Sequence, residues 1–164
     1  MGIRKCLKLA AVILLAAMAA PAQTAPVTDQ EKNIQAYVGL LRSDVLKAKS
    51  QVISEVMQFD SGQAAKFWPI YKDFETESIK IGDAIQALVK DYVTNYDQMT
   101  PEIADRLATK LLEVEQQRHD LKKKYYARLK GALDAVTATR FLQVENQLEK
   151  VLDLQLAAQL PAMD

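Results

Sequence analysis

The most constraining feature of the sequence is a seam of mostly apolar residues that runs through residues 61–95. Its members are spaced alternately three and four residues apart: Ala64, Phe67, Tyr71, Phe74, Ser78, Ile81, Ile85, Leu88 and Tyr92. Because an α-helix has about 3.6 residues per turn, this spacing places all of them on one side of a helix. Such a seam is typical of an antiparallel bundle or coiled coil, in which another helix covers it.

Four places in the sequence share the pattern of a helix start. In each, an apolar residue precedes a residue whose side chain can cap the first turn: Val27-Thr28, Phe59-Asp60, Met99-Thr100 and Val136-Thr137. These starts predict helices at about 29–58, 61–95, 101–133 and 137–159. The connections are only a few residues long, so consecutive helices should run antiparallel. The predicted fold class is therefore all-α, an elongated antiparallel bundle of four helices.

The first 22 residues have the pattern of a secretory signal peptide. A short basic segment precedes the apolar run LAAVILLAAMAA, and Ala20-Pro21-Ala22 supplies an A-x-A cleavage site. The apolar run is shorter than the roughly 20 residues of a membrane-spanning helix. We therefore expect cleavage before Gln23, a periplasmic or secreted protein, and one helical domain over residues 23–164 with no transmembrane segment.

Composition excludes several classes of function for the mature chain. Cleavage removes Arg4, Lys5 and Lys8, which leaves 18 basic against 21 acidic residues and a net charge of −3. A chain of this charge is a poor binder of nucleic acid. Cleavage also removes Cys6, the only cysteine, and with it disulfides, cysteine-bound zinc and a cysteine nucleophile.

The residues that remain carry no recognisable catalytic or metal-binding motif. His119 is the only histidine, and the sequence contains no EF-hand loop, no P-loop and no G-x-G-x-x-G. A di-iron bundle would need Glu-x-x-His on two helices. We therefore expect no enzyme activity, no catalytic residue, no metal site and no cofactor.

One polar level interrupts the apolar seams. Folding residues 61–95 against 101–133 about Gln98 sets Tyr71 near Tyr125 and Ser78 opposite Arg118, with Glu75 close enough to supply a counter-charge. This polar inter-helix layer is either a binding site within the bundle or an ion pair that fixes the register of the helices. Polar residues at seam positions most often have the second role.

A second polar group lies in the stretch RFLQVEN. Arg140, Glu145 and Asn146 flank or face away from the apolar seam of the fourth helix, and folding about Ala135 brings Tyr125 and Tyr126 to their level. A hydrogen bond from either tyrosine to Glu145 or Asn146 would tie the two helices together. We interpret these five residues as a structural clasp, with a ligand site as the alternative.

Aromatic residues are concentrated near the start of the second helix. Phe67 and Tyr71 follow the seam, whereas Trp68 lies beside it, next to Pro69. Apolar surface of this kind is a candidate site for a client or partner protein. The alternative is simple packing against the first or fourth helix.

Two of the helix starts resemble a known family. Met99-Thr100-Pro101-Glu102-Ile103 keeps the threonine, and Phe59-Asp60-Ser61-Gly62-Gln63 keeps the glutamine, of the L-T-x-x-Q signature found at helix starts in Spy/CpxP periplasmic stress proteins. The resemblance covers about residues 44–130. It implies a cradle-like helical protein, often a homodimer, that binds unfolded proteins without ATP or partners an envelope sensor.

The expected function follows from this resemblance and the predicted export. It is that of a periplasmic helical binding protein, chaperone-like or part of the envelope stress response, with unfolded or envelope proteins as partners. The alternatives are an adaptor or modulator of an envelope sensor and a purely structural envelope protein.

Overall fold

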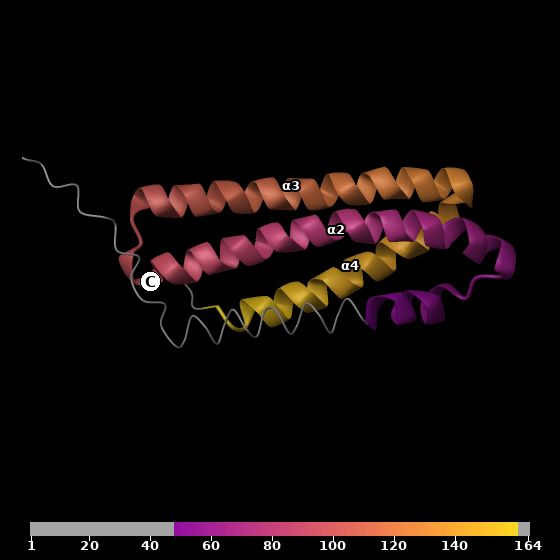
Figure 1. The fold of residues 1–164 in the computed structure, drawn as a ribbon, viewed down its shortest axis with the longest axis horizontal. Helices are drawn as coiled ribbons and strands as arrows, with labels where there is room; N and C mark the ends of the chain where they lie inside the picture. Colours follow the sequence, from indigo (N-terminus) through magenta and orange to yellow (C-terminus); the bar gives the residue numbers. More distant parts are fainter. Residues whose placement is uncertain (1–47, 161–164) are drawn as a thin grey trace, which may run out of the picture.

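The computed structural model describes residues 48–160. The predicted signal peptide, the cap at Thr28 and most of the predicted first helix lie outside these residues. The described part contains a helix over residues 48–57, α2 (Ser61–Asn95), a short 3-10 helix η1 (Tyr96–Gln98), α3 (Pro101–Ala132) and α4 (Ala135–Ala157), and it contains no strand. The predicted all-α fold is confirmed, and Figure 1 shows the helices lying lengthwise in an elongated bundle.

The predicted caps explain where α2 and α3 begin. The Asp60 carboxylate accepts a hydrogen bond from the Gln63 amide at 2.8 Å, and the Gln63 side chain accepts one from the Asp60 amide at 3.3 Å. These two bonds form a complete capping box. At α3, the Thr100 hydroxyl accepts from the Ile103 amide, and Pro101 occupies the first turn.

The predicted cap of α4 is wrong by one turn. The helix begins at Ala135, and Asp134 caps it by accepting hydrogen bonds from both the amide and the hydroxyl of Thr137. Thr137 therefore lies inside the first turn. A carboxylate competes well for the free amides at a helix start because it accepts a charge-assisted bond there.

The core is concentrated at the end of the bundle where α2 begins. It is formed by buried side chains from all four described α-helices: Ile53, Met57, Phe67, Tyr71, Phe74, Leu121, Tyr125, Leu129, Ala138, Phe141 and Val144. Phe141 lies at its centre, with its ring centroid 5.9 Å from Phe67, 6.2 Å from Tyr71 and 5.2 Å from Phe74. These edge-to-face contacts hold α4 against α2 at this end.

The register between α2 and α3 differs from the predicted one by about one turn. Tyr125 packs against Phe74, at 5.3 Å between ring centroids, rather than against Tyr71. The ion pair between Arg128 and Asp73 is shifted in the same direction. The difference arises because η1 continues the path of α2 as far as Gln98, so the chain reverses nearer Thr100.

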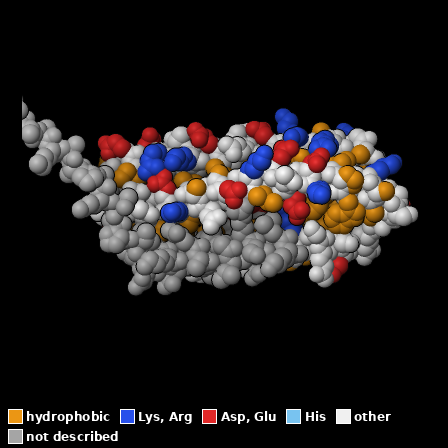
Figure 2. Space-filling model, viewed as in Figure 1, with side chains coloured by type: hydrophobic (Ala, Val, Ile, Leu, Met, Phe, Trp, Pro, Cys, Tyr) orange, Lys and Arg blue, Asp and Glu red, His pale blue; other side chains and the backbone are white. Residues whose placement is uncertain are grey.

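The outer face carries charges of both signs. Figure 2 shows them interspersed, with hydrophobic side chains gathered near the end where α2 begins. Several of these charges join α2 to α3: Lys124 pairs with Glu77 at 2.7 Å, and Asp91 pairs with Arg106 and Lys110. Hydrogen bonding to Arg106 is the main reason that the pKa of Asp91 lies below its usual value.

None of the described helices combines the length and apolar character needed to cross a membrane.

Candidate functional site

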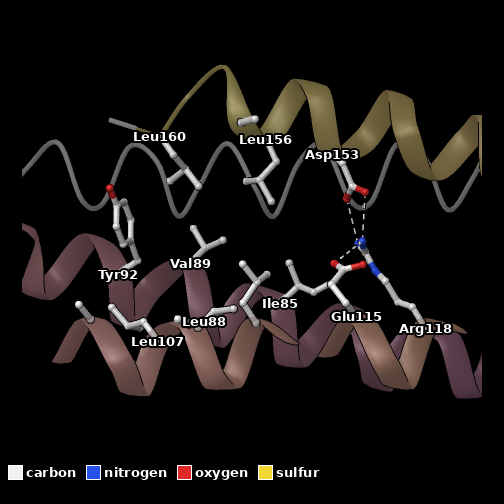
Figure 3. Close-up of a pocket in the computed structure, with 14 residues that line it drawn as sticks. Ile85, Leu88, Val89, Tyr92, Leu107, Glu115, Arg118, Asp153, Leu156 and Leu160 are labelled. Carbon is white, nitrogen blue, oxygen red and sulfur yellow. Dashed lines mark hydrogen bonds and ion pairs between the residues drawn. The ribbon is translucent and has the colours of Figure 1, made fainter. Parts of the chain in front are cut away.

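A pocket of about 600 Å³ lies between α2, α3 and α4, at the opposite end from the aromatic core (Figure 3). Most of its lining is apolar and comes from all three helices and the residues just after α4: Ile85, Leu88, Val89 and Tyr92 of α2, Ala104, Leu107, Ala108 and Leu111 of α3, Leu156 and Ala157 of α4, and Leu160 beyond its end. Val89 and Leu107 are buried, whereas Leu111 is 48 % exposed. We call this pocket the apolar groove.

The groove exists because the two ends of the bundle are filled differently. At the core end, the large ring of Phe141 spans the space between α4 and α2. At the groove end the facing positions hold aliphatic side chains, and Ala104, Ala108 and Ala157 are too small to fill the space. Figure 1 shows α4 running away from α2 toward its own C-terminal end.

A charged cluster closes one end of the groove. The Arg118 guanidinium donates two hydrogen bonds of 3.0 Å to the Asp153 carboxylate and one of 3.1 Å to Glu115, and it pairs with Glu149 at 3.2 Å. Lys122 also pairs with Glu149, at 2.7 Å. The cluster therefore holds two basic and three acidic side chains, which leaves one formal negative charge at this end.

Arg118 remains charged in this position. Burial opposes its charged form, but the hydrogen bond to Asp153 and the charges of Asp153, Glu149 and Glu115 outweigh burial and raise the pKa of Arg118. Its two parallel bonds to Asp153 have the paired geometry that guanidinium and carboxylate groups prefer. Arg118 therefore joins α3 to α4 and has little capacity left to bind an anion.

The predicted polar layer of Ser78, Glu75 and Arg118 is not what the structure contains. Arg118 turns toward Asp153 and Glu149 on α4 instead of Ser78 on α2. Burial is the main cause that raises the pKa of Tyr71, and the nearby charges of Glu145 and Glu75 add to it. The role proposed for Arg118, a polar tie between helices, agrees with its contacts, but its partner helix was predicted wrongly.

The predicted clasp residues fall into separate interactions. Tyr125 donates a 2.8 Å hydrogen bond to Glu77 of α2, and Asn146 accepts one of 3.1 Å from Lys122. Arg140 is exposed and Tyr126 is half-buried against the core. Within residues 48–160, no hydrogen bond joins Tyr125 or Tyr126 to Glu145 or Asn146. The prediction of these hydrogen bonds is therefore wrong.

Glu145 instead holds the helix 48–57 against α4. Its carboxylate lies 2.6 Å from the Lys49 ammonium, with side-chain exposures of 5 % for Glu145 and 12 % for Lys49. Lys49 also lies over the Phe74 ring, 5.2 Å from its centroid. Burial is the main cause that raises the pKa of Glu145, and the positive charge of Lys49 opposes this effect.

The predicted client-binding residues divide between core and surface. Phe67 is fully buried and Tyr71 is 2 % exposed, so both belong to the core. Trp68 is half-buried, and its ring meets those of Phe67 and Tyr71 edge to face at 5.3 and 5.6 Å. Only Trp68 of the three reaches the surface, and its role in partner binding stays a prediction.

The apolar groove and the buried Lys49–Glu145 pair were not predicted from the sequence. A signal for the groove was present, because Ala104, Ala108 and Ala157 place small side chains where three helices meet.

Within residues 48–160, no group of three or more histidine, cysteine or acidic side chains is arranged to hold a metal ion. Comparisons of the chain with protein-family models, with curated proteins and with solved structures found no match.

Proposed function

We propose that this protein is an exported helical binding protein that holds apolar segments of unfolded polypeptides without nucleotide, and that the apolar groove is its binding site. The apolar groove is the observation that carries this proposal. Pockets that hold apolar ligands are concave, mostly apolar and bordered by a few polar groups, and this one has the Arg118 cluster at one end.

The lining of the groove suits a peptide segment better than a rigid cofactor. It consists largely of aliphatic side chains from helices that face one another, an arrangement that accepts apolar side chains of many shapes. The acidic surplus beside Arg118 also favours segments that carry a basic residue next to the apolar ones.

The proposal predicts chaperone-like behaviour in solution. The mature chain, whose N-terminus mass spectrometry should place near Gln23, is expected to suppress the aggregation of an unfolded substrate at about equal molar ratio and without ATP. Light scattering during dilution of the substrate from denaturant measures this effect. Failure to suppress aggregation, together with specific capture of one membrane protein, would replace the chaperone proposal with an adaptor of an envelope sensor.

A further inference from the structure

The apolar groove has α2, α3 and α4 as its walls, and the helix 48–57 packs at the core end of the same bundle. Ile53 and Met57 pack into the core beside α2, and Lys49 bridges to Glu145 of α4. The helix 48–57 therefore contacts both α2 and α4 at the core end. Residues 29–47, which precede it in the chain, continue the pattern of apolar residues with Ile34, Val38, Leu41 and Val45.

We propose that residues 29–47 of this chain dock in the apolar groove as a continuation of the helix 48–57, and that a client binds by displacing them. This inference deepens the proposed function and rests on it, since it names what occupies the client site when no client is bound. Three features of residues 29–47 support it: the length of the segment, the positions of its apolar residues along the bundle axis and its charge.

The length of residues 29–47 as a helix matches the distance from the helix 48–57 to the far end of the apolar groove. From Phe74, which lies beneath Lys49, to Tyr92 at the far end of the groove, α2 advances about 27 Å at 1.5 Å per residue. The 19 residues from 29 to 47 would advance about 28 Å as a helix. A helix over this segment therefore ends level with the end of the groove.

The level of each apolar residue follows from the Lys49–Glu145 pair. The short connection from residue 57 to Ser61 makes the helix 48–57 antiparallel to α2, and α4 runs in the same direction as α2. Counting back from Lys49 while counting forward from Glu145 sets Val38 level with Leu156 and Ile34 level with Leu160. Both Leu156 on α4 and Leu160, three residues after its end, line the groove.

The charge of the segment also fits. The same count sets Arg42 level with Leu152, the residue before Asp153, at the end of the groove where Glu115, Glu149 and Asp153 outnumber Arg118 and Lys122. In a helix, Arg42 would lie at the edge of the apolar face that contains Val38 and Leu41, so a docked helix would present Arg42 toward the cluster and its apolar face toward the groove. A basic residue at this level offsets the surplus negative charge.

Disulfide trapping in the full chain tests this arrangement. Cys6 is replaced by serine so that introduced cysteines are the only ones, and Val38→Cys is combined with Leu156→Cys. The matched control combines Val38→Cys with Leu142→Cys, which lies on the same face of α4 about 21 Å nearer its start. Because a disulfide needs Cα atoms within about 7 Å, the first pair should close readily within one chain and the control pair should not.

The docked segment should also block the client site. The oxidised Val38→Cys/Leu156→Cys chain is expected to lose suppression of aggregation and to regain it on reduction. If only the Val38→Cys/Leu156→Cys disulfide forms but the oxidised chain still suppresses aggregation, the segment docks as proposed but clients do not bind by displacing it. Equal closure of both pairs, or disulfides that form only between two chains, would overturn the docking. Helicity of the reduced chains is checked by circular dichroism, and Ile34→Cys with Leu160→Cys replaces the first pair if that variant does not fold.

Discussion

Replacement of Phe141 by alanine should destabilise the protein by about 3–5 kcal/mol, the usual range for deletion of a buried aromatic ring. Phe141 is fully buried, and its ring contacts Phe67, Tyr71 and Phe74 at once. Its removal leaves a cavity at the point where α4 meets α2. Urea unfolding followed by circular dichroism measures the free energy of unfolding.

Val136→Ala is the matched control for Phe141→Ala. Val136 lies on the same helix but is 74 % exposed, so its replacement should change the free energy of unfolding by less than about 0.5 kcal/mol. A loss below about 1 kcal/mol for Phe141→Ala would show that α4 does not depend on the aromatic core.

The second large effect is expected from Lys49→Met, which leaves the buried Glu145 carboxylate without its counter-charge. Loss of one partner of a buried ion pair costs about 3 kcal/mol or more. Methionine keeps an apolar side chain over the Phe74 ring, so the change acts mainly on the charge. The double variant Lys49→Met/Glu145→Leu removes both charges and should recover most of the loss.

This destabilisation should depend on pH with a definite sign. Burial already raises the pKa of Glu145 in the folded protein, and loss of Lys49 should raise it further. A group whose pKa is higher in the folded state favours folding below its unfolded pKa, and this contribution is lost as pH rises through the folded pKa. The Lys49→Met defect should therefore be largest near pH 7 and shrink as pH falls toward the ordinary glutamate pKa. A defect of equal size at both ends of this range would contradict the burial of Glu145.

Local features of the sequence predicted the helices well. Residues 61–95 form α2 with the predicted bounds, and α3 ends within one residue of its predicted end. These bounds depend on caps such as Asp60 and Thr100, whose hydrogen bonds lie within a few residues of the helix start. The cap of α4 was missed because Asp134 and Thr137 both offer an oxygen near the same turn, and sequence alone does not rank them.

Contacts between helices were harder to predict because they depend on distances along the bundle. One additional turn at η1 was enough to move Tyr125 from Tyr71 to Phe74. Arg118 was assigned to α2 because Ser78 lies at its level, but its long side chain reaches Asp153 on α4. The groove depends on the divergence of α2 and α4, which the seam of either helix alone does not reveal.

The most direct test of the groove as the client site is a comparison of two neighbouring leucines of α3. Leu111 lines the groove and is 48 % exposed, whereas Leu112 is 69 % exposed and lies outside the lining. Leu111→Glu places a carboxylate in the groove, and Leu112→Glu places one on the outer surface. Both variants should fold, because exposed positions tolerate a charge.

The measurement is suppression of aggregation of the same unfolded substrate by wild type and both variants at equal concentration. We expect at least about a tenfold weaker apparent affinity for Leu111→Glu, since burying an unpaired carboxylate against an apolar segment costs more than 1.4 kcal/mol. Leu112→Glu should behave as wild type does. Equal activity of all three proteins, or a greater loss for Leu112→Glu, would contradict the assignment of the groove as the binding site.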